Sequence, residues 1–195
     1  LELKEFSAGE INILGNNLSY ISHYQAQELR KKWGVLFQAG ALFSSLTVGE
    51  NIALPLIEYT DLSPKMIEDI VAFKINLVGL KLADASLYPS QISGGMKKKS
   101  ALARALAMDP KLLFLDEPTS GLDPISARDF DALILKLRDL LGLSIVMVSH
   151  DLQSIYDTLD RVAIIDNKTI AFEGTLAEVT SVKSSFIQTF FADKR

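Results

Sequence analysis

The stretch Leu112-Leu-Phe-Leu-Asp-Glu-Pro118 decides the fold class. Its continuous apolar run is typical of a strand buried on both faces of a parallel sheet. The strand delivers two adjacent carboxylates, Asp116 and Glu117, at its C-terminal end. Ligands of α/β proteins bind at that edge of the sheet. The segment therefore predicts both an architecture and the position of a site.

The segments that follow alternate between helix and strand. A helix is predicted from Pro124 to Leu141, and Ser144–Val148 has the pattern of a second buried strand. This alternation predicts a parallel α/β sheet with right-handed crossovers. Residues 40–100 carry mostly helical patterns and no clear strand. They predict a helical insertion on the sheet.

Local signals place the remaining elements. Thr47 and Glu50 have the spacing of a capping box, and Pro55 is expected to end that helix. Ser63 is the expected N-cap of a helix that begins at Pro64 and ends near Gly79. The other expected elements are helices over 25–32, 93–108 and 151–159 and near Leu176 and Phe186, and strands over 9–15, 35–38, 161–165 and 169–172.

The composition narrows the classes of function. The 195 residues are 48% hydrophobic and 23% charged, with a net charge of −4. A chain of this composition can build a hydrophobic core. A general nucleic-acid binder would be basic, so the negative net charge disfavours that class of function. The absence of cysteine excludes disulfides and cysteine-based zinc sites, and two histidines are too few for a histidine-rich metal site. No apolar run approaches the roughly 18 residues of a membrane-spanning helix.

Polar side chains follow three of the predicted strands. Asp116 has the chemistry to hold Mg²⁺, which prefers oxygen ligands, and Glu117 could polarise a water as a general base. His150 directly follows the second buried strand and could contact a γ-phosphate, and Gln38 ends a third strand at the same edge. Each feature alone also fits a plain structural role, such as a solvated acidic turn or a core histidine.

Two turns add candidate residues. Ser93-Gly-Gly-Met96 opens a helix, with Ser93 as the N-cap, and the glycines let backbone N–H groups approach an anion. Taken alone, this segment is better interpreted as an ordinary junction of loop and helix. Ser120-Gly-Leu-Asp-Pro124 is a turn that places Asp123 just after the acidic pair.

The order and spacing of these features are more specific than any one of them. They resemble the Q-loop (Gln38), signature (Ser93-Gly94-Gly95), Walker B pair (Asp116-Glu117), D-loop (Asp123) and switch histidine (His150) of an ABC-type ATPase. Ser93 lies 116 − 93 = 23 residues before Asp116, with Ala101-Leu-Ala-Arg-Ala105 between them. The resemblance covers essentially the whole chain.

The resemblance implies a P-loop NTPase-like parallel sheet with a helical ABC subdomain. It divides the chain into part of the ATPase core (1–38), a helical subdomain with the signature (39–108) and the rest of the core (109–195). It implies ATP and Mg²⁺ as cofactors, and a homodimer that sandwiches two ATP molecules. The implied roles are catalytic for Glu117 and His150, metal-binding for Asp116 and Gln38, and nucleotide-binding for Gln38, Ser93, Gly94, Gly95 and Asp123.

Further residues resemble the lipid-transport branch of this family, whose ATPases work with MCE proteins. They include Phe37-Gln-Ala-Gly-Ala-Leu-Phe43 and Met96, which a basic run follows. This likeness implies phospholipid transport, a membrane permease seated near residues 38–60 and a peripheral place on the cytoplasmic face of the inner membrane. An MCE-type substrate-binding protein is a further expected partner. Lys97, Lys98 and Lys99 are expected to form a solvated helix face near ATP rather than a nucleic-acid contact.

Other members of the family remain alternatives. The chain could serve another ABC importer or exporter, or be a degenerate, non-catalytic interaction module. A soluble ABC ATPase of DNA repair or translation would carry two cassettes or a long coiled-coil insertion. The spacing of 93 − 38 = 55 positions from Gln38 to Ser93 leaves room for neither.

The phosphate-cradling motif Gly-x-x-x-x-Gly-Lys-Ser/Thr is absent from the sequence. The family carries this Walker A loop before the segment that matches residues 3–15. We therefore expect an ABC ATPase that lacks its N-terminal Walker A strand and loop and is inactive as this chain alone. A naturally degenerate protein is the alternative. Loss of a central strand would expose a strand edge, which self-association or another segment is expected to cover.

Overall fold

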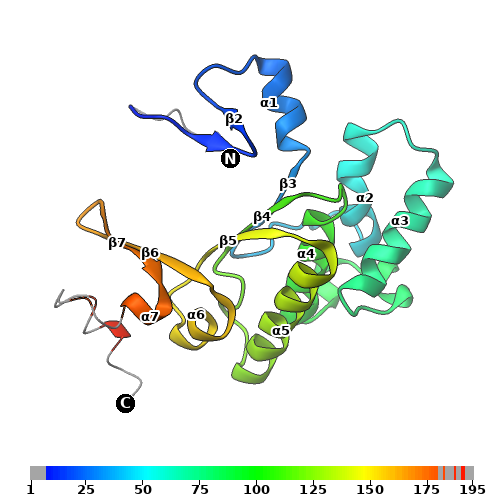
Figure 1. The fold of residues 1–195 in the computed structure, drawn as a ribbon. Coiled ribbons are helices and arrows are strands. Elements are labelled where there is room, and N and C mark those ends of the chain that lie inside the picture. The colour runs from blue at the N-terminus through cyan, green and yellow to red at the C-terminus, as the bar shows by residue number, and fades with distance from the viewer. Residues whose placement is uncertain (1–7, 180–181, 183–186, 188–189, 192–195) are drawn as a thin grey trace.

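A computed structural model describes residues 8–179, 182, 187, 190 and 191. Its centre is a parallel sheet in the order β3 (Trp33–Leu36), β4 (Leu112–Asp116) and β5 (Ser144–Val148) (Figure 1). Leu113 of β4 lies opposite Gly34 on one side and Ile145 on the other. The parallel α/β sheet predicted from the sequence is therefore confirmed, although β3 begins and ends two residues before the expected 35–38.

Alternation along β4 directs two leucines into the main core. Leu113 and Leu115 are each about 1% exposed, and they share a cluster with residues of α4 (Gly94–Ala105) and α5 (Pro124–Leu141). Gly34 lets helix α4 approach β3 closely, because a Cβ there would lie 2.2 Å from the carbonyl oxygen of Ala105. One face of the sheet is thus packed on helices.

Strand β5 differs from the prediction of a buried strand. Its side chains alternate between exposed and half-buried, and Val146 and Val148 are 48% and 59% exposed. In the described part of the chain, β4 is the only strand that pairs with β5, so one edge of β5 is open. A run of apolar residues cannot by itself distinguish a strand that is buried on both faces from one that is half-exposed.

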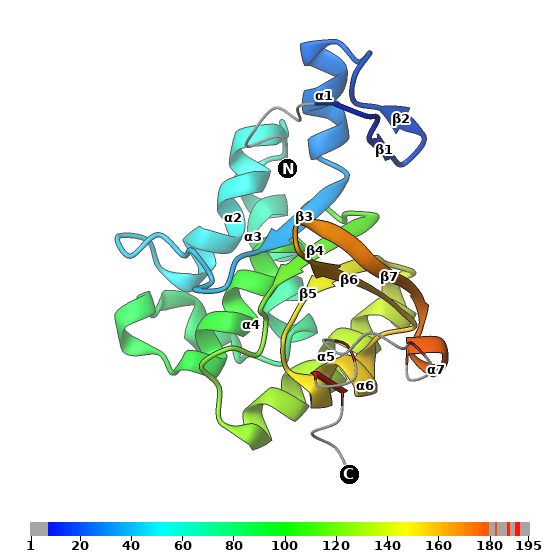
Figure 2. The same ribbon diagram turned by 90° about the vertical axis from the view of Figure 1, so that its left-hand side faces the viewer.

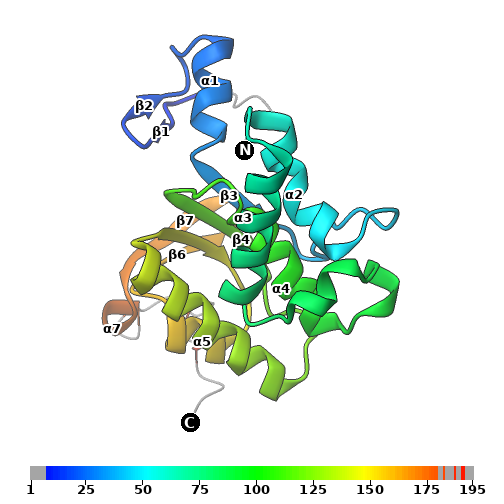
Figure 3. The ribbon, with the colours of Figure 1, turned by 90° about the vertical axis from the view of Figure 1, so that its right-hand side faces the viewer.

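Between β3 and β4 the chain is helical. Helix α2 (Val48–Tyr59) packs on α3 (Pro64–Leu77) and on α4, and two short 3₁₀ segments, Leu82–Ser86 and Pro89–Gln91, lead into α4 (Figure 3). The described residues hold no strand between 40 and 100, as predicted.

The caps of α2 and α3 follow the sequence. Thr47 and Glu50 form the capping box, and Ser63 caps a helix that starts at Pro64. The expectation that Pro55 ends α2 is wrong, because the helix continues to Tyr59. Burial of Leu56, at 3% exposure, favours the extra turn despite the hydrogen bond that a proline cannot make.

The C-terminal elements are α6 (Leu152–Thr158), a hairpin of β6 (Arg161–Asp166) and β7 (Thr169–Thr175), and α7 (Leu176–Val179). They surround a second, smaller core of Ile155, Val162, Val179 and Ile187. Figure 2 shows the hairpin beside β5, and the two make no ladder. Phe186, where a last helix is expected, lies outside the described residues, and the described Ile187, Phe190 and Phe191 near it are helical.

The N-terminal part is less regular than predicted. The expected strand over 9–15 is reduced to a small hairpin of β1 (Asn12–Ile13) and β2 (Asn16–Asn17). Helix α1 (His23–Arg30) then leads into β3. Helix α4 likewise stops at Ala105, before the expected Met108. Among the described helices, none has the length and hydropathy to cross a membrane.

Candidate functional site

The site is built where β4 and β5 end side by side. Asp116 is the last residue of β4 and pairs with Val148, the last residue of β5. The amide of Glu117 then donates to the carbonyl of Val148 over 2.9 Å. This pairing brings Glu117 close to His150, which follows Val148 by two residues. The parallel register therefore joins two predicted residues that are far apart in the sequence.

Glu117 and His150 are in direct contact. Nδ1 of His150 lies 2.6 Å from Oε1 of Glu117. The Glu117 side chain is 16% exposed and that of His150 is 75% exposed, so the pair sits at the edge of the molecule with the carboxylate on the inside. The hydrogen bond to Glu117, reinforced by its negative charge, raises the pKa of His150. A base held by an adjacent imidazole is an arrangement suited to moving a proton.

Gln38 lies two residues beyond the end of β3. Its Nε2 donates to Oγ of Ser120, in the turn after Glu117, over 3.3 Å, and its carbonyl accepts from Nζ of Lys98 at 2.5 Å. Gln38 is therefore tied to the acidic turn through Ser120 and Lys98. Asp116, Glu117, His150 and Gln38 gather at one edge of the sheet, as the sequence predicts.

Sequence reasoning missed the part played by the basic residues of α4. Lys98, predicted to be solvated, is only 6% exposed, and it donates to the carbonyls of Gln38 and Glu117. Burial lowers the pKa of Lys98, while the charges of Asp116 and Glu117 act in the opposite direction. Helical spacing could have revealed this position, because Lys98 lies three and four residues before Ala101 and Leu102, which are fully buried.

Arg104 extends the same pattern. Its two terminal nitrogens donate to the carbonyls of Ala41 and Gly40, each over 2.8 Å, and burial lowers its pKa. Two cations of one helix thus hold three backbone carbonyls of the loop after β3.

The glycine turn lies apart from the acidic pair. Ser93 caps α4 by accepting from the amide of Met96 over 3.2 Å, and Gly94 and Gly95 form the first turn. A Cβ at Gly95 would meet nothing within 4 Å, so this helix end is open. Within the described residues, no hydrogen bond or ion pair joins this turn to Glu117 or His150.

Asp123 caps helix α5. Its carboxylate accepts from the amides of Ile125 and Ser126, both over 3.0 Å, and from Oγ of Ser126 at 2.5 Å. These bonds lower the pKa of Asp123. Asp123, which the sequence predicts to bind nucleotide, therefore also stabilises the N-terminus of α5.

The donor set fits one end of a magnesium nucleotide. Mg²⁺ in nucleotide sites takes one or two protein oxygens together with phosphates and water, and Asp116 and the amide oxygen of Gln38 have that chemistry. In the described part of the chain no three acidic or histidine side chains cluster into a metal site of their own. The 195 residues hold no Gly-x-x-x-x-Gly-Lys-Ser/Thr motif to cradle the other phosphates. The residues present fit Mg²⁺ and a γ-phosphate better than a whole nucleotide.

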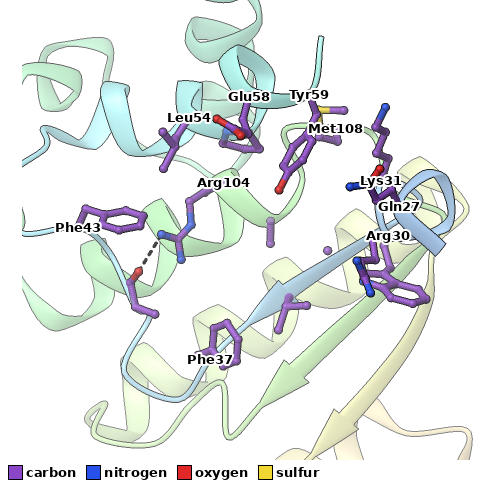
Figure 4. A pocket seen from close by; sticks show the side chains of 16 residues that line it. Gln27, Arg30, Lys31, Phe37, Phe43, Leu54, Glu58, Tyr59, Arg104 and Met108 are labelled. Carbon is purple, nitrogen blue, oxygen red and sulfur yellow. Dashed lines mark hydrogen bonds between the residues drawn. The ribbon is translucent and has the colours of Figure 1, made fainter. Parts of the chain in front are cut away.

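A separate pocket of about 730 Å³ opens between α1, β3, α2 and α4. Figure 4 shows Phe37, Phe43, Tyr59 and Arg104 around it, with Arg104 bonded to the carbonyl of Ala41. Among the residues proposed from the sequence for the site, none lines this pocket. Its apolar rings, with Arg30, Lys31 and Glu58 at the rim, suit a protein segment better than a phosphate.

A comparison with family models places the chain. Residues 1–120 match the model described as ABC transporter. The chain belongs to the ABC transporter family. It is 42% identical over 167 residues to the intermembrane phospholipid transport system ATP-binding protein MlaF of Haemophilus influenzae, and 40% identical over 167 residues to that of Escherichia coli. These matches cover 86% of the chain and 63% and 62% of the relatives.

Relatives of another kind are also similar. The methionine import ATP-binding protein MetN of Streptococcus agalactiae is 40% identical over 183 residues, which cover 92% of the chain and 51% of the relative. The chain thus spans less than two thirds of the length of the curated ABC relatives named here.

Solved structures of ABC proteins share the fold. The dimeric cassette MJ0796, in a post-hydrolysis state bound to ADP and Pi, has a TM-score of 0.77 and 27% identity over 87% of this chain and 74% of its own. The protein cbiO1 of Clostridium perfringens, part of the transporter complex cbiONQ, has a TM-score of 0.80 and 28% identity over 91% of this chain and 70% of its own. The predicted fold class, a P-loop NTPase-like α/β cassette, is confirmed.

Proposed function

We propose that the chain belongs to the ATP-binding and ATP-hydrolysing subunit of an ABC transporter that moves phospholipids. The observation that carries this proposal is the contact of Glu117 with His150 beside Asp116, at the ends of two paired parallel strands. The likeness to MlaF proteins supports the lipid substrate, and the likeness to MetN keeps import of a small solute as the second candidate.

The positions of the side chains support the following proposed roles. Glu117 takes a proton from the attacking water as the general base, and His150 orients that carboxylate and contacts the γ-phosphate. Asp116 and Gln38 would hold Mg²⁺, which would neutralise charge on the phosphates. Ser93, Gly94 and Gly95 form an anion-binding helix end for the nucleotide of a second copy, and Asp123 links the two sites.

The proposed division of labour follows the sequence boundaries. Residues 1–38 and 109–195 form the ATPase core, and 39–108 form the helical subdomain. A membrane permease would seat on the pocket lined by Phe43, Tyr59 and Arg104, beside the loop that carries Gln38. The proposal includes a peripheral position of the subunit at the cytoplasmic face of the inner membrane, with an MCE-type protein as a further partner. Because the net charge is −4, nucleic acid is not a proposed partner.

Calorimetric titration with Mg-ATP tests the proposal. The chain by itself is expected to bind weakly, because no phosphate-cradling motif is in its sequence. In the assembled transporter, Glu117→Gln is expected to lower turnover by about 10²–10⁴-fold while Mg-ATP binding is kept. Equal loss of binding and turnover would remove Glu117 from the role of base. A Phe43→Asp variant that still co-purifies with the permease would contradict the docking site.

A further inference from the structure

The loop after β3 and the turn after β4 share an unusual backbone feature. Ala41 and Glu117 both have positive backbone φ values, +48° and +46°, which residues other than glycine rarely adopt. Such a conformation persists only where its surroundings hold it. At both residues the carbonyl accepts a hydrogen bond from a cation of helix α4, namely Arg104 for Ala41 and Lys98 for Glu117.

Lys98 joins the two segments directly. Its Nζ donates to the carbonyl of Gln38 at 2.5 Å and to that of Glu117 at 3.1 Å. The amide of Glu117 is held from the other side by Val148, over 2.9 Å. The backbone of the general base is therefore fixed between β5 and α4. Because the side chain of Lys98 is buried, water cannot readily replace these hydrogen bonds, and breaking them costs free energy.

Arg104 secures the rest of the loop. It donates to the carbonyls of Gly40 and Ala41, and the ideal Cβ of Gly40 would lie 3.3 Å from the Cβ of Ala101. The loop is thus packed on the face of α4 from which both cations project. Helix α4 begins at the Ser93-Gly94-Gly95 turn, so the same helix carries the anion-binding end and the two cations.

We propose that Lys98 and Arg104 are positioning residues that make helix α4, the Gln38–Ala41 loop and the backbone of Glu117 move as one body. A displacement of the glycine turn would then shift the amide of Gln38 and the carboxylate of Glu117 together. This inference rests on the proposed function for its catalytic consequence, and on the hydrogen bonds alone for its mechanical part.

Amide hydrogen exchange in this chain tests the mechanical part. In Lys98→Met, the amides of Gly40, Glu117 and Ser120 are expected to exchange about tenfold faster or more, since each reports on a segment that Lys98 holds. Amides of α5 in the core are expected to keep their rates. Lys97→Met removes the same charge one position away and is the matched control. Faster exchange throughout the chain, or no local change, would overturn the proposal.

Steady-state turnover in the assembled transporter tests the catalytic part. Lys98→Met is expected to lower kcat about 10- to 100-fold with KM for ATP within about twofold, because a displaced base loses alignment rather than nucleotide affinity. Lys98→Arg should recover most of the turnover, because it keeps the charge and the donors. A rise in KM with unchanged kcat would contradict positioning.

Two further results distinguish failure of the mechanical part of the proposal from failure of the proposed function. If Lys98→Met does not fold, Lys98→Gln keeps one donor and is expected to show the same local exchange pattern more weakly; unchanged local rates there would overturn the proposal. If turnover in the assembled transporter proves insensitive to Glu117→Gln, the proposed function fails while the exchange result still decides whether Lys98 links the segments.

Discussion

Nδ1 of His150 lies 2.6 Å from Oε1 of Glu117 across 33 residues of sequence. The contact exists because β4 and β5 are parallel and in register, so that Asp116 pairs with Val148. Glu117 follows the end of β4 by one residue and His150 follows the end of β5 by two, so their side chains can meet. This relationship makes the titration of His150 a direct reporter on the site.

The pKa of His150 is expected to lie above its usual value of about 6.5, and Glu117→Gln should lower it toward that value. Proton NMR of the ring measures both. A pKa that is raised by folding adds stability that is full below about pH 6.5 and is lost as the pH rises through the folded value. The variant should lose that part of the pH dependence. Asp151→Asn is the control, because Asp151 is a smaller cause of the shift, and an unchanged His150 in Glu117→Gln would contradict the contact.

Asp131 predicts a second pH dependence. It is 7% exposed, accepts from Oγ of Ser154 over 2.9 Å, and burial raises its pKa to about 6. Its contribution to stability is full below the unfolded pKa, near 3.8, and is lost as the pH rises through about 6. Asp131→Asn should therefore stabilise the chain by about 1–2 kcal/mol at pH 8, after solvent screening is allowed for, and less at pH 5.

Chemical denaturation at the two pH values measures this effect. Asp129→Asn, which changes an exposed acid on the same helix, is the matched control. A gain at Asp131→Asn that is larger at pH 5 than at pH 8 would reverse the sign and refute the burial argument.

The capping duty of Asp123 is testable apart from any nucleotide. Asp123→Ala removes the acceptor for two amides and one hydroxyl and should lower the free energy of unfolding by about 1 kcal/mol. Asp123→Ser keeps a capping oxygen and should recover most of the loss. Equal losses in both variants, measured by denaturant unfolding, would show that Asp123 does not act as a cap.

The open edge of β5 predicts self-association. Val146 and Val148 expose about half of their surface, and within the described residues no strand pairs with the edge of β5 that faces away from β4; such edges pair with other chains. Sedimentation should show oligomers that Val146→Lys returns to monomer. Ile57→Lys, at an exposed position of α2, should leave them unchanged. A wild-type chain that is monomeric at every concentration would refute the expectation of self-association.

Local signals were reliable wherever neighbouring residues decide the structure. Helix α5 spans the predicted Pro124–Leu141, and the caps at Thr47 and Ser63 lie where predicted. A cap depends on a side chain and an amide within one turn, so the sequence contains the whole interaction. Pro55 shows the opposite case, because burial of Leu56 in the main core outweighed a local breaker.

The candidate site also combines features that the sequence predicts with features that it does not. The residue types Asp116, Glu117 and His150 and their places after apolar strands could be predicted, since polar residues at strand ends follow from the pattern alone. The roles of Lys98 and Arg104 could not, because a run of three lysines does not say which of them faces the loop after β3. The proposal of Asp123 for nucleotide binding stays a prediction, and its capping bonds are a feature of the turn geometry.

The sequence by itself determined the fold class, the order of strands and helices along the chain, and the family resemblance, because these depend on spacing and on the alternation of apolar and polar residues. Tertiary structure alone decided which strand edge stays open, which lysine is buried, and that Glu117 touches His150. These features depend on how segments that lie far apart in the sequence pack and pair. No single stretch of residues determines the free energy of that packing.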